Sequence, residues 1–142
     1  MQKIFESRKD LRRELLTIKK FIKKNKLKYT YEKLDWKSLD YELYECKKLV
    51  AVVEIKNFKV AWGFFPTVLV ALKKYIKMLG VKEEKDVPVY FMAHFYCGTI
   101  AWIEVDQIDG ENKHFERNEI REGAASDAEE VFYVVNELFK TI

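Results

Sequence analysis

The fold prediction rests on residues 40–56, which read DYELYECKKLVAVVEIK. From residue 39 to residue 45 apolar and polar side chains alternate, and from residue 49 to residue 56 the chain is almost continuously apolar and rich in β-branched residues. The short polar interruption between the two runs predicts a β-hairpin. Because the second strand is apolar on both faces, we expect it to be central in a sheet and covered on both sides.

Charged residues end this apolar strand. Glu54 and Lys56 alternate onto the same face, and charged side chains are rarely buried unless they are paired or bind a metal. With a three-residue hairpin loop, Glu45 would oppose Leu49. Asp40 would then oppose Glu54, with the two Cβ atoms about 4.5–5.5 Å apart. A two-residue loop would instead place Asp40 on the wrong face.

Two carboxylates at that separation repel each other unless a cation lies between them, and hard oxygen ligands suit Mg²⁺ or Mn²⁺. A nearby lysine, Lys56, could orient a water or stabilise negative charge on a phosphate, and a bound metal lowers the pKa of its water. This chemistry hydrolyses phosphodiesters. The alternative is an edge strand whose end reaches solvent, with Glu54 and Lys56 as surface charges. Glu-x-Lys occurs four times in the sequence, and only at Glu54 does it end an apolar strand.

Three helices are expected around this hairpin. Apolar residues at helical spacing predict an amphipathic helix over 4–24. A second helix is predicted over 66–79, with Pro66 in its first turn and Gly80 as its stop. A capping-box pattern opens a third helix over 127–140.

Further strands are predicted outside the hairpin. The order α, β, hairpin, α, β, β, α predicts one α/β domain over residues 1–142, with a mixed β-sheet flanked by helices. The additional strands are expected at 27–32, 87–95 and 99–106.

Composition excludes several classes of protein. The chain has 142 residues, 49% hydrophobic and 35% charged, which suits one folded domain and excludes a disordered chain. No apolar run approaches the ~20 residues that span a bilayer, and the charged N-terminus is unlike a signal peptide, so we expect a cytoplasmic protein with no membrane partner. Cys46 and Cys97 form no CxxC pair, which argues against a disulfide framework or a cysteine zinc site. The phosphate-binding glycine motifs of NTPases and dinucleotide enzymes are missing.

Charge is unevenly distributed along the chain, although the net charge is only +3. Residues 1–28 carry 11 Lys and Arg against 3 Asp and Glu, whereas residues 99–142 carry 4 against 11. The basic end suggests an anionic partner. A lysine cluster in it could follow a phosphate backbone or be the solvated face of a helix. Its members are Lys19, Lys20, Lys23, Lys24, Lys26 and Lys28.

Two groups of aromatic residues leave alternatives open. The first group could stack on unpaired bases or be half-buried in strands, and it comprises Tyr29, Tyr31, Trp36 and Tyr41. The second group could wedge into a distorted duplex, form a dimer patch or pack in the core, and it comprises Trp62, Phe64 and Phe65.

Five features follow one another along the chain: Arg13-Glu14-Leu15 in a basic helix, Asp40, Lys47-Lys48 in a turn, Glu54-Ile55-Lys56 after an apolar run, and two later paired strands. Together they resemble the PD-(D/E)xK nuclease superfamily, whose restriction-endonuclease-like core has the order αβββαβ. The resemblance extends over residues 8–106 and is greatest to archaeal Holliday junction resolvases.

The resemblance implies a Mg²⁺- or Mn²⁺-dependent DNA endonuclease, with branched DNA as a candidate substrate and a homodimer as a candidate assembly. Asp40 and Glu54 would hold the metal together with the backbone carbonyl of Ile55, and Lys56 would position or activate the water. Glu14, at the border of the apolar stripe of its helix, would be a third carboxylate or a solvated residue paired with a neighbouring cation. DNA would be contacted by Lys19, Lys20, Lys23, Lys24, Lys47 and Lys48.

The chain also departs from that family. Many relatives carry a Gln-x-x-x-Tyr pair after the Glu-x-Lys strand, whereas here Tyr75 is preceded by Ala71 at the glutamine position. The predicted C-terminal helix is an addition to the αβββαβ core. The alternative function is therefore a non-catalytic nucleic-acid-binding or assembly protein that retains the nuclease fold.

Overall fold

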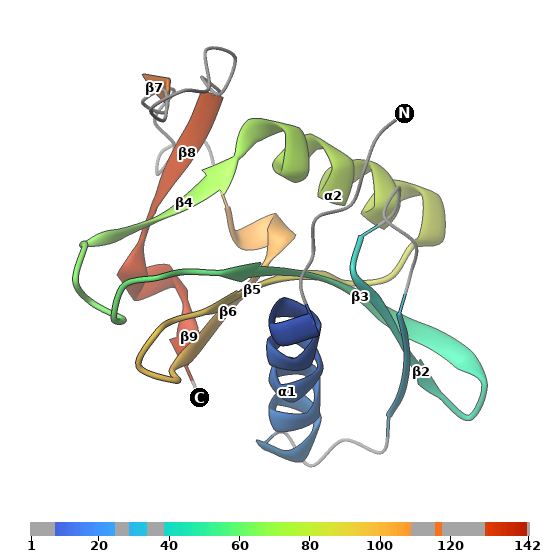
Figure 1. Ribbon diagram of the computed structural model, residues 1–142. Helices are drawn as coiled ribbons and strands as arrows, with labels where there is room; N and C mark the ends of the chain where they lie inside the picture. The colour runs from blue at the N-terminus through green and yellow to red at the C-terminus, as the bar shows by residue number, and fades with distance from the viewer. Residues whose placement is uncertain (1–7, 25–28, 34–38, 109–115, 118–129, 142) are drawn as a thin grey trace.

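The computed structural model describes residues 8–24, 29–33, 39–108, 116–117 and 130–141. These residues form two α-helices and two β-sheets (Figure 1). The larger sheet has the strand order β1-β2-β3-β5-β6-β9, and the smaller has the order β4-β8-β7. The bounds are α1 Arg8–Lys24, β1 Thr30–Lys33, β2 Tyr41–Glu45, β3 Lys48–Asn57, β4 Thr67–Ala71, α2 Leu72–Lys85, β5 Val89–His94, β6 Ile100–Glu104, η1 Val105–Gln107, β7 Glu116–Arg117, β8 Glu130–Val135, η3 Asn136–Leu138 and β9 Lys140–Thr141.

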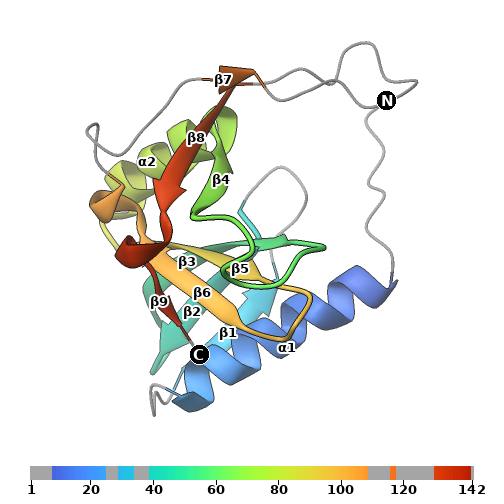
Figure 2. The same cartoon turned by 90° about the vertical axis from the view of Figure 1, so that its left-hand side faces the viewer.

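Strand β3 lies inside the larger sheet, antiparallel to β2 on one side and parallel to β5 on the other. Its face that carries Val53 and Ile55 packs against Phe21 of α1. Its other face, which carries Val52, packs into the core beneath α2 and the smaller sheet (Figure 2). The apolar character of both faces is explained by this double burial. The prediction of a central strand covered on both sides is confirmed.

The hairpin between β2 and β3 has a two-residue loop, so the predicted three-residue loop is wrong. Glu45 pairs with Lys48, and the loop consists of Cys46 and Lys47. Both loop residues have positive φ angles, 50° and 66°. Two consecutive positive φ angles are typical of the type I′ turn, whose twist matches that of the flanking strands.

A β-bulge in the same hairpin corrects the register. Leu43 pairs with Ala51 and the next residue, Tyr44, pairs with Leu49, so Val50 is the additional residue on β3. A bulge of one residue shifts the pairing by one position and thereby exchanges the two faces of the strand. The one-residue register shift from the short loop is cancelled by the one-residue shift from the bulge. The residues before β2 therefore face β3 in the register that the longer loop would have produced.

The apolar run at the start of the predicted helix 66–79 forms β4 instead. Val68 and Val70 are buried while their neighbours are partly exposed, which is the period of two expected of a strand paired with β8. Helix α2 begins after β4 and continues through Gly80 to Asp86, which ends it in the left-handed conformation with φ 53°. The predicted start at Pro66 and stop at Gly80 are therefore wrong.

The predicted C-terminal helix 127–140 is also wrong. Residues 130–135 form β8, which pairs with β4, and residues 140–141 form β9 at the edge of β6. The sequence EVFYVV is β-branched and aromatic, and such residues favour a half-buried strand wherever a partner edge is available. Val131, Phe132 and Val134 are buried there.

The fold class is confirmed, because the core runs α1, β1, β2, β3, α2, β5, β6 with a mixed sheet between helices. Among the described residues, no helix is long and apolar enough to cross a membrane. Several predictions lie outside the described residues, namely those on residues 4–7, 27–28 and 127–129 and on Lys26, Lys28 and Trp36.

Candidate active site

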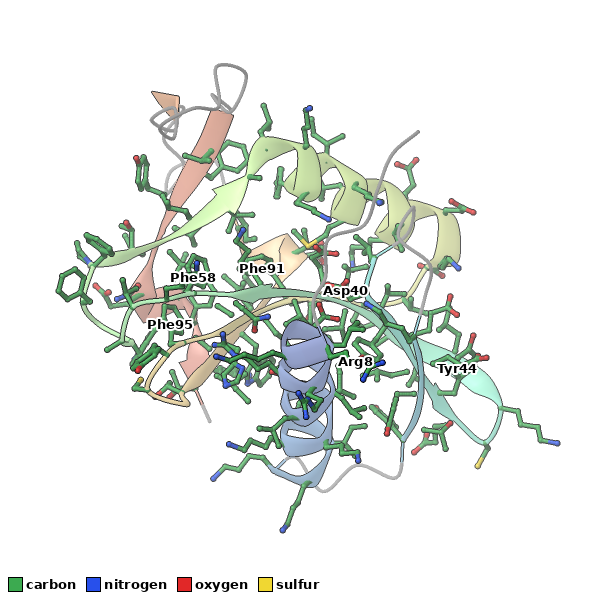
Figure 3. The ribbon with its side chains drawn as sticks, in the orientation of Figure 1. Arg8, Asp40, Tyr44, Phe58, Phe91 and Phe95 are labelled. Atoms are coloured by element: carbon green, nitrogen blue, oxygen red, sulfur yellow. The ribbon has the colours of Figure 1, made fainter. Side chains whose placement is uncertain are left out.

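Asp40 and Glu54 come together where β2 begins beside β3. The backbone N–H of Asp40 donates to the Val53 carbonyl at 3.0 Å, and Tyr41 pairs with Val53. Asp40 thus lies directly before the first pair of the register, beside Val53 and Glu54, and its charge acts on the Glu54 carboxylate. Asp40 lies beside β3 (Figure 3), where the Ile55 backbone N–H donates to its Oδ2 at 2.8 Å and so holds the carboxylate in place.

Glu54 is a buried carboxylate, and only one of its two oxygens has a partner among the described residues. It is 5% exposed. Its Oε2 lies 2.9 Å from Nζ of Lys74 on α2, whereas its buried Oε1 has no hydrogen-bond partner among the described residues. Burial, followed by the charge of Asp40, raises the pKa of Glu54 to about 7, and Lys74 and Lys77 offset only part of this rise.

A lysine connects Asp40 to the first helix. Nζ of Lys33, at the end of β1, donates to Glu14 Oε1 at 2.9 Å and to Asp40 Oδ1 at 3.2 Å. Glu14 is buried against the sheet. The first helix therefore does carry a carboxylate into this region, joined to Asp40 through one ammonium group.

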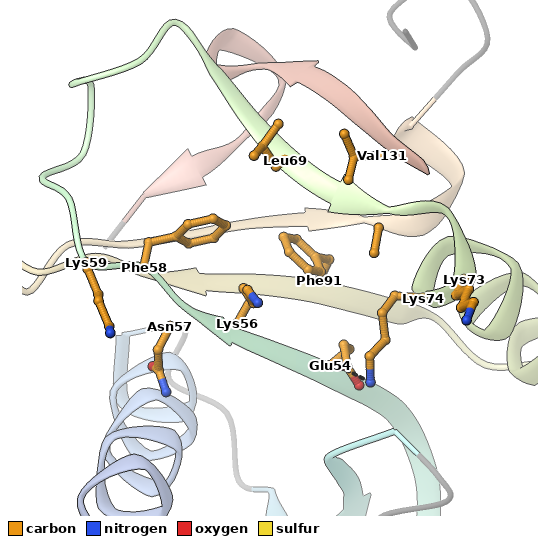
Figure 4. A pocket seen from close by; sticks show the side chains of 11 residues that line it. Glu54, Lys56, Asn57, Phe58, Lys59, Leu69, Lys73, Lys74, Phe91 and Val131 are labelled. Atoms are coloured by element: carbon orange, nitrogen blue, oxygen red, sulfur yellow. Dashed lines mark ion pairs between the residues drawn. The ribbon is translucent and has the colours of Figure 1, made fainter. Parts of the chain in front are cut away.

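Lys56 shares the face of β3 that carries Glu54, as predicted, and its side chain is exposed. Both residues line a cavity of about 680 Å³ (Figure 4). Lys59, Lys73 and Lys74 line the same cavity. Its remaining wall consists of Asn57 and of apolar residues from β4, β5, β8 and Phe58. The cavity therefore combines the Glu54 carboxylate with several ammonium groups, which can attract an anion such as a phosphate.

The backbone of Ile55 offers one more oxygen on this side. The N–H and C=O of a strand residue point to the same side of the strand. Since the Ile55 N–H points to Asp40, its carbonyl also points to the side of β3 on which Asp40 lies.

The oxygen atoms present fit a hard divalent cation. Asp40, Glu54 and the Ile55 carbonyl offer carboxylate and carbonyl ligands, which Mg²⁺ and Mn²⁺ prefer. The unpartnered Oε1 of Glu54 is a buried acceptor that such an ion would satisfy. No three His, Cys, Asp or Glu side chains within the described ranges are grouped to hold a metal. Glu14 is connected to Asp40 through the Lys33 ammonium group.

The lysines that were predicted to contact DNA are all exposed, and they fall into two groups. One group lies on α1, and the other, Lys47 and Lys48, lies at the hairpin turn. Glu54 follows Lys48 by six positions on β3, which is about 20 Å along the strand. The α1 group consists of Lys19, Lys20, Lys23 and Lys24.

The sequence did not identify Lys33 and Lys74 as site residues. Lys33 follows the predicted strand 27–32 by one residue, and Lys74 lies in the predicted helix 66–79, so neither had a motif to mark it. The aromatic residues of the first group that are described lie in or beside strands: Tyr41 is buried and Tyr31 packs against it, with ring centroids 6.1 Å apart.

Comparisons with known proteins agree with this architecture. A solved structure of Hjc from Archaeoglobus fulgidus, a Holliday junction resolvase from an archaeal hyperthermophile, matches with a TM-score of 0.52 over 87% of this chain and 84% of that chain. The sequence identity is 7%, so this likeness shows the fold alone. A search of curated proteins finds no match to this chain.

The family comparison covers the full length. The model described as "Phage putative PDDEXK endonuclease" matches residues 1–142. This family match supports a nuclease. The chain therefore belongs to this phage PDDEXK endonuclease family.

Proposed function

We propose that this chain is a divalent-metal-dependent endonuclease that hydrolyses phosphodiester bonds in DNA. The observation that carries the proposal is the buried Glu54, which lies close to the Asp40 carboxylate and lines a cavity together with several lysines. A carboxylate that is buried with one unpartnered oxygen lowers stability, and such sites are typical of function rather than of packing.

Asp40 and Glu54 would hold Mg²⁺ or Mn²⁺, with the Ile55 carbonyl as a further ligand. When bound, the metal supplies a water of lowered pKa and polarises the phosphoryl oxygen. The Ile55 N–H holds Asp40 in place through its 2.8 Å hydrogen bond. Lys33 ties Asp40 to Glu14, which we keep as the candidate third carboxylate.

Lys56 is the candidate catalytic lysine. Its ammonium group is exposed in the same cavity as Glu54, so it can contact a phosphate or orient the attacking water. Lys74 is held on Glu54 by an ion pair of 2.9 Å. We assign Lys74 to positioning Glu54 and to neutralising it when the metal is absent, and we assign the contact with the substrate to Lys56.

DNA would be held by its phosphate backbone through the α1 and hairpin lysines. Because Hjc is a Holliday junction resolvase, branched DNA is the candidate substrate. The candidate assembly is a homodimer, as the resemblance of the sequence to the nuclease superfamily implies. We place this activity in the cytoplasm.

A second candidate function is a non-catalytic DNA-binding or assembly protein with the same fold. It is favoured by one observation: within the described residues Glu14 is not grouped with Asp40 and Glu54 as a third metal ligand. Such a protein would bind DNA without cutting it.

Cleavage of supercoiled plasmid and of a synthetic four-way junction in Mg²⁺, in Mn²⁺ or in EDTA tests the proposal. The test variant is Glu54→Gln, and the matched control is Glu42→Gln, because Glu42 is also buried and also ion-paired with a lysine of α2, Lys85, at 2.8 Å. We expect metal-dependent cleavage that falls by about 100-fold or more in Glu54→Gln and is unchanged in Glu42→Gln. Equal cleavage by wild type and Glu54→Gln would contradict the proposal, and binding without cleavage would support the second candidate.

A further inference from the structure

A pair of exposed aromatic rings lies in the connection that follows β3. Phe64 is 68% exposed and Phe65 is 54% exposed. The two rings contact each other edge to face, with centroids 4.8 Å apart. Tyr96, in the turn between β5 and β6, is 79% exposed. Apolar rings that face water on one part of the surface mark an interaction site more often than they serve the fold.

The connection is tied to the β5–β6 turn, which lies beside it (Figure 1). The backbone N–H of Tyr96 donates to the Val60 carbonyl at 2.9 Å, and the backbone N–H of Trp62 donates to Sγ of Cys97 at 3.4 Å. The Trp62 ring is the inner member of the aromatic group, because it packs edge to face on Phe95 at 5.2 Å.

The far end of the connection is held by η3. Nδ2 of Asn136 donates to the Phe65 carbonyl at 2.7 Å, and the Asn136 backbone N–H donates to the Pro66 carbonyl at 3.0 Å. The backbone under Phe64 and Phe65 is thus fixed on both sides while the rings stay outside. A partner that docks on fixed rings loses less conformational entropy than one that must order a loop.

Phe65 of the aromatic pair lies at a small cavity that borders the candidate active site. Phe65 lines a cavity of about 140 Å³, and this cavity shares Phe58, Lys59 and Leu69 with the larger cavity that contains Glu54. A strand of DNA whose phosphate lies at Glu54 would therefore pass close to the rings.

The charge of this surface favours DNA over a second copy of the chain as the molecule that binds there. The segments 56–66 and 95–99 contain Lys56 and Lys59 and no acidic residue. A second copy of the chain docked here around a twofold axis would bring these lysines against each other. A polyanion meets complementary charge instead.

We infer that Phe64 and Phe65 form a stacking platform for unpaired DNA bases next to the bond to be cut. The inference rests on the proposed function, since it names the class of DNA that the nuclease site receives. Every base has a π-face, so stacking on aromatic side chains selects unpaired bases over paired ones without sequence preference. The substrate class is DNA with unpaired bases or a branch point, in which bases are already released from the duplex.

Binding in EDTA tests this inference separately from cleavage. Fluorescence anisotropy would compare a labelled duplex that contains a run of unpaired thymines with the fully paired duplex. The test variant is Phe64→Ala/Phe65→Ala. The matched control is Ile76→Ala on α2, where an exposed apolar side chain of similar accessibility (59%) lies outside the platform.

We expect the double alanine variant to bind the unpaired-base DNA at least about 5-fold more weakly and the paired duplex as wild type does. Phe64→Tyr/Phe65→Tyr should restore binding, whereas Phe64→Leu/Phe65→Leu should not, because leucine has no π-face. Unchanged preference for unpaired bases in the alanine variant would overturn the inference, as would a wild-type protein that binds neither DNA.

Self-association gives the other decisive outcome. Suppose that wild type sediments as a dimer that both the alanine and the leucine variants fail to form, with DNA binding unchanged in both variants. In that case the surface is an interface between copies and the inference is wrong. If wild type cleaves no DNA but its binding to unpaired bases still depends on Phe64 and Phe65, the proposed nuclease function is wrong and the stacking platform is supported.

Discussion

The Glu54 carboxylate lies 2.9 Å from the Lys74 ammonium group and still has one buried oxygen without a hydrogen-bond partner among the described residues. Glu42, on the neighbouring strand, has the contrasting arrangement: Oε2 accepts from Lys85 at 2.8 Å and Oε1 accepts from Tyr44 at 2.6 Å. Both carboxylates are buried and both face α2. Of the two, Glu54 lacks a full set of donors, and its pKa is raised further by the charge of Asp40.

The pH dependence of stability should reflect this difference. In the metal-free protein, burial and Asp40 raise the pKa of Glu54 from 4.5 to about 7. Between these two values the folded state binds more protons than the unfolded state, so Glu54 makes the free energy of unfolding fall as the pH rises. Glu54→Gln removes this titration. We therefore expect its Tm in EDTA to exceed that of wild type by about 5 °C at pH 8 and to approach it near pH 5.

Glu42→Gln is the control for that measurement and should change Tm in the opposite direction. Hydrogen bonds from Lys85 and Tyr44 lower the pKa of Glu42, so its stabilising contribution is present above the unfolded value and is lost as the pH falls through the folded value. Glu42→Gln should be less stable than wild type at pH 8. A destabilised Glu54→Gln at pH 8 would show that the Lys74 pair outweighs burial.

Metal binding should raise the Tm of wild type. An ion that binds only the folded state stabilises it by about 2.7 kcal/mol at 100 times its Kd. We expect Mn²⁺ titrated into the wild type to raise Tm by several degrees at pH 8, and the rise to disappear in Asp40→Asn and Glu54→Gln but persist in Glu42→Gln. Thermal denaturation with and without Mn²⁺ measures this. An equal rise in Asp40→Asn would exclude Asp40 as a ligand.

The two cavity lysines should behave differently when truncated. Lys56→Ala should lower the cleavage rate by about 100-fold and leave Tm unchanged, because Lys56 is exposed on the cavity wall. Lys74→Ala should lower Tm by a few degrees in EDTA, because it leaves the buried Glu54 charge without its closest cation. Lys73→Ala is the charge-matched control from the same cavity. If Lys74→Ala abolishes cleavage while Lys56→Ala does not, the roles of the two lysines are exchanged.

Salt dependence of DNA affinity should identify the phosphate-contacting lysines. Each neutralised phosphate contributes about 0.9 to the slope of log K against log salt for duplex DNA. Alanine at all four α1 positions (Lys19, Lys20, Lys23 and Lys24) should therefore lower the slope by up to about 3–4. Fluorescence anisotropy over a salt series measures it. Lys140→Ala, at the β9 edge of the sheet, should leave the slope unchanged, and an unchanged slope in the quadruple variant would show that α1 does not follow the backbone.

Much of the core followed from local pattern. The continuous apolar run before Glu54 can be satisfied only by burial on both faces, so its central position was predictable, and alternation alone put Glu54 and Lys56 on one face. The runs at 66–72 and 130–135 were predicted wrongly because short apolar segments have no period that separates strand from helix. The two segments form strands, and not helices, because they pair with each other as β4 and β8.

The approach of Asp40 to Glu54 has a local and a long-range cause. That two acidic side chains flank an apolar hairpin can be read from the amino-acid sequence, because side-chain alternation and hydrophobic burial act over a few residues. That the two-residue turn is offset by a bulge at Val50, and that Lys33 and Lys74 reach the carboxylates from β1 and α2, became visible in the folded chain alone. Strand register and the approach of distant lysines depend on how whole elements pack, and no local pattern in the chain encodes that packing.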